Sequence, residues 1–206
     1  MLLGNGAGSF ATAATLSSAT PKSISAADFN LDGKMDIASS NASLNCVSVF
    51  LGIGRGSFGT SGNFTLTSGF SPIFVTGQDI NADGKPDLVA VQNNFSVLAI
   101  LLGNGSGGFN APTYIVADAV SVCPGDFNGD GIVDLATAYN FNGVSILPGT
   151  GSGNFGLASN FFIGTQPRSI CKADFNGDGK EDLATADILS ANVSVLLNCT
   201  ISGISN

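Results

Sequence analysis

One nine-residue pattern, Asp-x-Asn-x-Asp-Gly-x-x-Asp, occurs four times in this chain of 206 residues and constrains its fold more than any other feature. The four acidic loops cover residues 28–36, 79–87, 126–134 and 174–182, so the first Asp recurs after 51, 47 and 48 residues. Self-similarity at a nearly fixed period of this length is typical of repeat architectures. We therefore expect four copies of one supersecondary unit.

A glycine-rich marker repeats out of phase with the acidic loops. An apolar residue followed by x-Gly-x-Gly-x-Gly-x-Phe covers residues 2–10, 50–58, 101–109 and 147–155, and a fifth copy begins at Val195 but has Asn198 and Cys199 in place of the glycines. The glycines look like those of a phosphate-binding loop. Because neither a helix nor a Lys-Ser/Thr pair follows them, a hairpin turn is expected instead.

Short apolar runs flank both markers and indicate four strands in each unit. Examples are residues 169–173 before the fourth loop, 182–186 after it, 193–197 with period-two alternation, and 155–163 after a glycine-rich turn. Four short strands in a repeat of about 40–50 residues are typical of a propeller blade. We predict an all-β chain, namely a β-propeller of four four-stranded blades with each acidic loop between the first and second strands. The predicted single domain spans residues 1–206, with repeats at about 4–51, 52–102, 103–148 and 149–197.

The acidic loops have the residue types that a hard cation requires. Ca²⁺ takes about six to eight oxygen ligands, and a Gly at position 6 lets the chain turn back around the ion. Position 9 is Asp, and β-like runs follow the loops, so these are not EF-hands. Four structural Ca²⁺ sites are predicted, with Mg²⁺ less suited and a metal-free solvated turn as the alternative. The predicted ligands are the side chains of positions 1, 3, 5 and 9 and the carbonyl of position 7: Asp28, Asn30, Asp32, Lys34 and Asp36; Asp79, Asn81, Asp83, Lys85 and Asp87; Asp126, Asn128, Asp130, Ile132 and Asp134; Asp174, Asn176, Asp178, Lys180 and Asp182.

The net charge of −8 is explained by these loops, which hold 12 of the 15 acidic residues. Four Ca²⁺ ions would make the chain formally neutral. The chain has no basic footprint, so no nucleic-acid partner is expected. It has no apolar stretch of about 18 residues, so no membrane insertion is expected, and Met1–Leu3 runs straight into glycines, which argues against a signal peptide.

With these loops and the glycine-rich turns, the chain resembles the FG-GAP/VCBS repeat family, which includes the N-terminal propeller of integrin α subunits. Traces of the Phe-Gly and Gly-Ala-Pro signature survive at Phe58-Gly59, at Phe155-Gly156 and at residues 109–112. The resemblance covers essentially the whole chain and implies a calcium-binding propeller that works outside the cell. It is less specific for biological role, because the family serves in adhesion, lectin-like and scaffold proteins.

The phase of the repeats leaves the completeness of the ring open. The chain opens at the end of a third strand, offers a fourth strand near residues 9–17, and has its last third strand at about Leu197. The N-terminal strand could complete the last blade and close a four-blade ring. Alternatively, the chain is part of a larger ring, or two chains combine into one.

Cysteines and sequons are consistent with an extracellular setting. Without His or a Cys-x-x-Cys pair, zinc is not expected. Two disulfides are predicted, preferably Cys123–Cys171 and Cys46–Cys199, with free thiols as the alternative. Six Asn-x-Ser/Thr sequons are candidate glycosylation sites, at Asn41, Asn63, Asn94, Asn104, Asn192 and Asn198.

Catalysis finds little support in the sequence, and we predict that the chain is not an enzyme. Without His no Ser/His or Cys/His relay can form, and only Asp118, Glu181 and Asp187 lie outside the predicted ligands. A lectin-like carbohydrate-binding propeller is the main alternative, although Trp is absent and only Tyr114 and Tyr139 are amphipathic aromatics. A hydrolase or lyase ranks last.

The predicted function is a calcium-stabilised extracellular propeller, secreted or at the cell surface, that acts as an adhesion, scaffold or assembly module. Its expected partner is a protein or glycan at the cell surface or matrix. A homo-oligomer or assembly by blade completion is a further possibility.

Overall fold

The structure is a computed structural model, and it describes residues 1–12, 14–92, 96–139, 141 and 143–199. These residues contain strands and turns but no helix, so the all-β prediction is confirmed. Accordingly, the described residues contain no helix long and apolar enough to cross a membrane.

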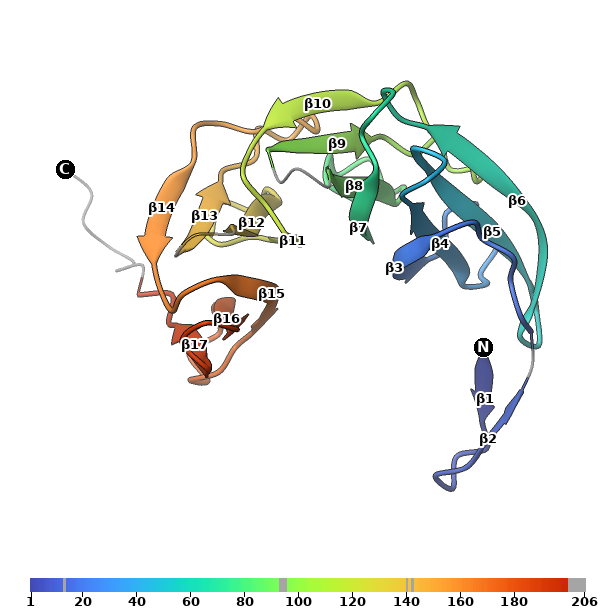
Figure 1. The fold of residues 1–206 in the computed structure, drawn as a ribbon, viewed down its shortest axis with the longest axis horizontal. Coiled ribbons are helices and arrows are strands. Elements are labelled where there is room, and N and C mark those ends of the chain that lie inside the picture. The colour runs from blue at the N-terminus through green and yellow to red at the C-terminus, as the bar shows by residue number, and fades with distance from the viewer. Residues whose placement is uncertain (13, 93–95, 140, 142, 200–206) are drawn as a thin grey trace. The chain divides into compact units, whose positions relative to one another are not determined.

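The strands form a two-stranded N-terminal hairpin and four antiparallel sheets, in which neighbours along the chain are neighbours in the sheet (Figure 1). The N-terminal hairpin consists of β1 (Leu2–Gly4) and β2 (Phe10–Thr12). The first sheet consists of β3 (Pro21–Ala27), β4 (Asp36–Asn41), β5 (Cys46–Gly54) and β6 (Ser57–Thr65). The second sheet consists of β7 (Pro72–Gln78), β8 (Asp87–Gln92), β9 (Val97–Leu101) and β10 (Thr113–Val116). The third sheet consists of β11 (Ser121–Gly125), β12 (Asp134–Tyr139), β13 (Gly143–Leu147) and β14 (Ser159–Phe162), and the fourth of β15 (Pro167–Ala173), β16 (Asp182–Asp187) and β17 (Asn192–Leu196).

The chain divides into two compact units. The first comprises Met1–Asp79, Gly84–Asn93 and Leu98–Ile115, and the second comprises Ile80–Asp83, Asn94–Val97 and Val116–Asn206. In the first unit β7 packs against β3, β4 and β5, and in the second unit β15 packs against β11 and β12. Each unit therefore contains the same kind of contact, in which the first strand of one sheet lies against the preceding sheet.

The second strand of each sheet is the most deeply buried, because it has a strand on either side. In β8, Leu88, Ala90 and Val91 are fully buried and Val89 nearly so. An uninterrupted apolar run is typical of a strand buried on both faces, whereas the outer strand β14 is exposed along its whole length. In the second unit the core gathers residues from both sheets, including Val120, Phe127, Val144, Ile170 and Leu183.

The four-stranded pattern holds for three of the four sheets, and the structure shows no closed propeller. Within the described residues β17 pairs only with β16, and β2 pairs only with β1. The fourth strand predicted over residues 155–163 is shorter, because Phe155 makes only an isolated bridge with Gly149 and regular pairing starts at Ser159. The strand predicted near residues 9–17 extends only from Phe10 to Thr12.

Candidate metal-binding loops

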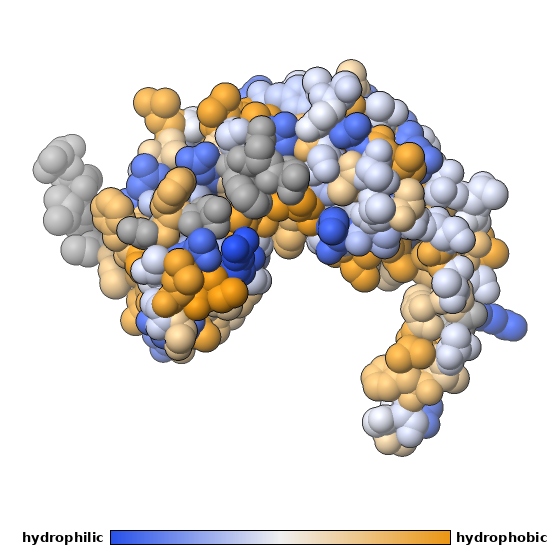
Figure 2. Space-filling model, viewed as in Figure 1, coloured by the Kyte–Doolittle hydropathy of each residue, from blue (hydrophilic) through white to orange (hydrophobic). Residues whose placement is uncertain are grey.

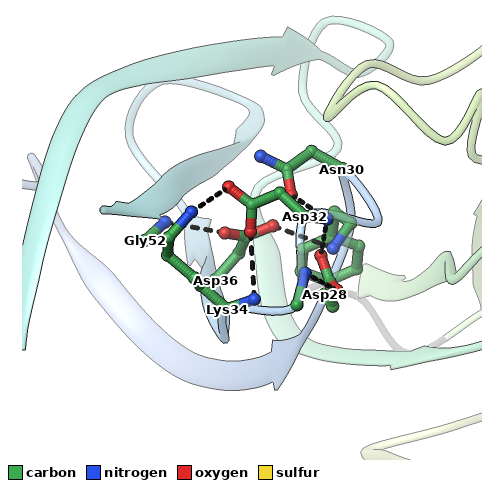
Figure 3. A network of polar contacts seen from close by, with 8 residues as sticks. Asp28, Asn30, Asp32, Lys34, Asp36 and Gly52 are labelled. Carbon is green, nitrogen blue, oxygen red and sulfur yellow. Dashed lines mark hydrogen bonds and ion pairs between the residues drawn. The ribbon is translucent and has the colours of Figure 1, made fainter. Parts of the chain in front are cut away.

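The first acidic loop folds into a turn held by its own side chains (Figure 3). The carboxylate of Asp28 accepts hydrogen bonds from the amides of Asp32 at 3.1 Å and Gly33 at 2.7 Å. The side-chain oxygen of Asn30 accepts from the Asp32 amide at 3.1 Å, and Asp32 accepts from the Lys34 amide at 3.0 Å. Short Asp and Asn side chains that bond to nearby amides are typical of tight turns. The side chains at positions 1, 3 and 5 therefore hold the loop in its turn conformation through hydrogen bonds to its own amides.

The third and fourth loops repeat these contacts. Asp126 accepts from the Gly131 amide at 2.9 Å, and Asp174 accepts from the Gly179 amide at 2.8 Å. In the second loop, Asp79 accepts from the Gly84 amide at 2.8 Å. Four separate stretches of sequence thus adopt one local geometry.

Backbone conformation explains the glycines of the loops. Position 6 has positive φ in all four loops, as Gly33 (φ 81°) and Gly131 (φ 82°) illustrate. Position 4 also has positive φ, although it is Leu31 (φ 59°) in the first loop and Ala82 (φ 60°) in the second. Glycine adopts this conformation at little cost, whereas other residues are strained in it. The sequence pattern identified position 6 and missed position 4.

Position 9 differs from positions 1 and 5, because its carboxylate is fully buried. Asp36, Asp87, Asp134 and Asp182 all have 0% exposure. The two carboxylate oxygens of Asp36 accept amide hydrogens from Phe29 at 2.8 Å and Gly52 at 2.7 Å. This Asp joins its own loop to the glycine-rich turn that follows sixteen residues later.

The same bond recurs in the other sheets and links the two repeated markers. The amide of Gly103 donates to Asp87 at 2.7 Å, and that of Gly149 donates to Asp134 at 2.8 Å. A Cβ atom at Gly103 would lie 2.2 Å from the carbonyl oxygen of Pro86, so only glycine fits this close approach. Sequence reasoning missed this role, although the nearly constant spacing between the position 9 Asp and the first turn glycine was a signal for it.

In the fourth sheet Asn198 occupies the place of that glycine. Its amide donates to Asp182 at 2.7 Å, and its side-chain Nδ2 donates to the carbonyl oxygen of Phe127 at 2.8 Å. Asn198 therefore preserves the buried bond while departing from the glycine pattern.

The pKa of three loop carboxylates departs from its ordinary value, downward at two exposed positions and upward at one buried position. The hydrogen bond from the Lys34 side chain lowers the pKa of Asp32, and loop amides, that of Gly179 first, lower the pKa of Asp174. Burial raises the pKa of Asp134, against the opposing effect of the Gly149 and Phe127 amides. Asp32 and Asp174 are thus held as carboxylates by the donors that surround them.

The donor set of each loop fits a hard cation by its chemistry, since carboxylate, amide and carbonyl oxygens are the ligands that Ca²⁺ prefers. In its geometry, the structure brings positions 1, 3 and 5 together on one turn and places position 9 beneath them against amides. Within the described part of the chain, no three His, Cys, Asp or Glu residues form a group that could hold a metal ion. The loop carboxylates as placed therefore contact amides, and the predicted calcium ligands remain a prediction.

Two of the three acidic residues outside the predicted ligands, Glu181 and Asp187, contact other side chains of the fold. Asp187 is buried and accepts hydrogen bonds from the hydroxyls of Thr185 and Ser194. Glu181 forms an ion pair with Lys172 at 2.5 Å and accepts the amide hydrogen of Asp126 at 3.0 Å. Both carboxylates have structural partners, so their contacts give no support to acid–base chemistry.

The two tyrosines considered for sugar binding make contacts within the fold, and one sequon asparagine is buried. Tyr114 accepts a hydrogen bond from the Thr67 amide at 2.8 Å and lies 5.8 Å from the ring of Phe70. Tyr139 lies so close to Gly143 that a Cβ atom there would be 2.1 Å from its hydroxyl. The sequon residue Asn41 is fully buried, so it is not open to glycosylation in the folded chain.

No disulfide joins the four cysteines, all of which lie in the described residues. In the first unit, the hydroxyl of Ser25, three residues before its loop, reaches the Gly77 amide on the next sheet at 3.0 Å. Cys123 and Cys171 hold the same place on β11 and β15, opposite Ala136 and Ala184. Both thiols are free at these matching positions, so the structure forms neither of the two predicted disulfides.

Comparisons with known proteins agree with the repeat structure. A model of the FG-GAP-like repeat matches the chain three times, over residues 32–90, 79–137 and 126–185. None of the curated proteins matches this chain. Among solved structures, that of BBS1N in complex with ARL6DN, soaked with lead, has a TM-score of 0.53 at 12% identity, covering 87% of this chain and 54% of that one. The V. cholerae biofilm matrix protein Bap1 has a TM-score of 0.46 at 20% identity, covering 88% of this chain and 30% of that one. The chain thus spans about half the length of the first and less than a third of the second, and the first likeness concerns the fold alone.

Proposed function

Because the chain belongs to the FG-GAP-like repeat family, we propose that it is a calcium-stabilised β-propeller module that works outside the cell in adhesion, scaffolding or assembly. The acidic loops carry this proposal. In the first loop, two carboxylates and an amide oxygen lie on one turn, and the side-chain exposure of Asp32 is 34%. An ion bound there would relieve the repulsion between neighbouring carboxylates and stabilise the folded chain by mass action.

The ligands proposed for each ion are the side-chain oxygens of positions 1, 3, 5 and 9 and the carbonyl oxygen of position 7. Position 9 already accepts two amide hydrogens, and a carboxylate oxygen has a second lone pair with which it can accept more. The chain would hold the ion between the end of one strand and the start of the next. The ion then has a structural role, and no chemical step is assigned to it.

The contacts of the carboxylates support a non-enzymatic role. The loop carboxylates bond to loop amides, while Glu181 and Asp187 are engaged by Lys172 and by two hydroxyls. A general acid or base needs reach to a substrate in a pocket. A repeat scaffold that presents surfaces to a protein or glycan partner fits these contacts better than a hydrolase or lyase does.

The test is thermal unfolding of the protein after chelation, with Ca²⁺ and then Mg²⁺ added back. Calcium is expected to raise the melting temperature, and a hundredfold excess of free ion over Kd is worth about 2.7 kcal/mol for one site. The variant Asp130→Asn should lose part of this increase, because it replaces a proposed ligand. It should lose little stability in chelator, because the Asn side-chain oxygen can still accept the Ile132 amide that Asp130 accepts at 2.8 Å. Asp118→Asn is the matched control. A melting temperature that is the same with and without Ca²⁺ would refute the proposed metal role.

A further inference from the structure

In the first unit, the glycine-rich turn of the second sheet packs against the first sheet. The amide of Gly107 donates to the carbonyl oxygen of Phe29 at 3.0 Å. The ring of Phe109, which ends the turn, lies 5.6 Å from Phe29 and 4.8 Å from Phe64, edge to face in both pairs. The phenylalanine after the turn therefore fills a seat made by the preceding sheet.

The second unit has the same seat without a phenylalanine in it. Phe127 and Phe161 hold the places of Phe29 and Phe64, and with Leu183 and Leu196 they line an apolar groove of about 500 Å³. The Asn198 side chain donates to the Phe127 carbonyl oxygen, as the Gly107 amide donates to the Phe29 carbonyl oxygen in the first unit. However, no described residue of the fourth sheet supplies a ring. We call this groove the Phe seat.

The fourth sheet also has an open edge and an uncovered face. In the first sheet, Val47 and Val49 of β5 are buried under β7 and paired with β6. Their counterparts on β17, Val193 and Val195, are 68% and 52% exposed. Long exposed apolar edges are pairing sites in β-proteins.

The N-terminal hairpin is a glycine-rich turn whose phenylalanine has no seat. In it the Asn5 amide donates to the Ser9 carbonyl at 3.0 Å, as the Asn104 amide does to Gly108 in the second sheet. Phe10, at the place of Phe109, is 67% exposed, and Figure 2 shows the hydrophobic surface of this hairpin at its lower right. The turn is formed, and its ring projects into solvent.

The residues after the hairpin complete the correspondence. Phe64 and Phe161 each lie six residues after the phenylalanine of their turn, and Leu16 lies six residues after Phe10. Phe64 pairs with Val47 and Phe161 with Val144, so the counterpart of Leu16 on the fourth sheet is Val193. The described residues around Leu16, from Ala14 to Ser18, belong to no strand.

The first sheet presents a face that matches the uncovered face of β17. Ile24 on β3 holds the place of Val75, Val122 and Ile170, which are 1%, 2% and 7% exposed, whereas Ile24 is 69% exposed. In both units this position lies on a first strand that packs against the preceding sheet. Ile24 is apolar and exposed, so it could make the same kind of contact with a sheet of another copy.

We propose that a second copy of this chain docks on the fourth sheet, with its Phe10 in the Phe seat, its segment 14–17 paired with β17, and its Ile24 over Val193 and Val195. The donor and acceptor surfaces are different patches of the same chain, so the association is head to tail and closes into a ring or continues as a fibre. This geometry reproduces, between copies, the contact that joins the first and second sheets within the first unit. A second copy supplies it without requiring any particular placement of the two units of one chain.

Docking requires β1 to leave β2. Counted from the glycine-rich turn, residues 2–4 correspond to residues 196–198. In the fourth sheet residues 196–198 occupy that place at the end of the third strand, so β1 of the second copy has no place there. The exchanged strand is short, with three paired residues, and its side chains are exposed. A chain shortened to begin at Ser9 therefore lacks the competitor and should associate more tightly than the full chain.

The test is sedimentation velocity of the 206-residue protein over a hundredfold range of concentration. The wild type should gain mass with concentration. Phe10→Ala removes the donor ring and Val195→Lys places a charge on the acceptor face, and each should weaken association by about tenfold or more. Leu157→Lys, at a side chain that is 94% exposed and outside both surfaces, is the matched control and should associate as the wild type does.

Mixing the two variants gives the decisive measurement. Phe10→Ala keeps an intact acceptor and Val195→Lys keeps an intact donor, so an equimolar mixture should form a one-to-one dimer and nothing larger. Circular dichroism and melting curves verify that each variant folds. A mixture that stays monomeric, or a wild type that is monomeric throughout while the Phe seat is filled by its own hairpin, would overturn the assignment to a second copy.

Discussion

The first and third sheets each present a phenylalanine from the acidic loop to the next sheet, and the two phenylalanines are covered differently. On the first sheet, the turn that ends in Phe109 covers Phe29 with an aromatic ring and a backbone hydrogen bond. On the third sheet, Asn198 supplies the hydrogen bond to Phe127 with its side chain, and the space for the ring is an open groove. The comparison separates two functions of the glycine-rich turn, namely holding the buried Asp at position 9 and filling the seat on the preceding sheet. Asn198 performs only the first.

The two units also differ at the position three residues before each loop. Ser25 fills it in the first unit and contacts the next sheet, while Cys123 fills it in the second. Burial raises the pKa of Cys123 to about 11, the charge of Lys172 opposes this, and the charges of Glu181 and Cys171 add to it.

This difference gives the largest expected effect. With a pKa of about 11, roughly one Cys123 thiol in a thousand is ionised at pH 8, compared with roughly one in four for a free cysteine. Alkylation by iodoacetamide should therefore be more than a hundredfold slower in the folded protein than in urea, and should accelerate about tenfold per pH unit up to pH 11. Peptide mapping by mass spectrometry measures it, with the exposed Cys171 as internal control. Equal rates in folded and unfolded protein would contradict a packed interface at this position.

A second experiment compares the glycine of the second sheet with the asparagine of the fourth. Gly103→Ala would place a Cβ atom 2.2 Å from a carbonyl oxygen and disturb the buried bond to Asp87. It should cost about 3 kcal/mol of unfolding free energy. Asn198→Ala keeps its backbone amide and loses its side-chain hydrogen bonds, so it should cost about 1 kcal/mol. Urea denaturation measures both, and a cost for Asn198→Ala as large as that for Gly103→Ala would show that the side chain matters more than the amide.

How far the sequence predicts this structure depends on the range of the interaction. Strand positions, the glycine-rich hairpins and the loop turns follow from local patterns, since period-two alternation and turn chemistry are encoded within a few residues. The burial of Asp36 against Gly52 joins residues sixteen apart, and it was missed because an acidic loop suggested a metal ligand first. Whether Cys123 and Cys171 form a disulfide depends on how whole sheets pack on one another, which spacing in the sequence does not specify. The replacement of glycine by Asn198 was visible, but its bond to Phe127 joins residues of different sheets.

A third experiment tests the ring itself. Phe109→Ala removes edge-to-face contacts with two rings, and because Phe109 is half-buried the expected cost is about 2 kcal/mol. Phe161→Ala in the open Phe seat removes a side chain that is 46% exposed and should cost less than about 1 kcal/mol in the monomer. Denaturation at low protein concentration measures the difference. Equal costs for the two variants would show that the Phe seat is already filled in the isolated chain.

The smallest expected effect concerns position 4 of the acidic loops, where the second loop differs from the third. Ala82 is held at a φ of 60° while Gly129 has the same role at 78°. Holding an alanine in the left-handed backbone region costs about 1 kcal/mol of stability. Replacing it with glycine removes this strain, but it also raises the conformational entropy of the unfolded chain, which cancels part of the gain. Ala82→Gly should therefore stabilise the protein by about 0.5 kcal/mol. Gly129→Ala should destabilise it by a similar amount, because a Cβ atom there meets nothing within 4 Å and the change is confined to the backbone. Melting curves in chelator and in Ca²⁺ measure both variants. If the two substitutions shift stability in the same direction, the loops do not share the backbone geometry that their proposed common role as cation sites requires.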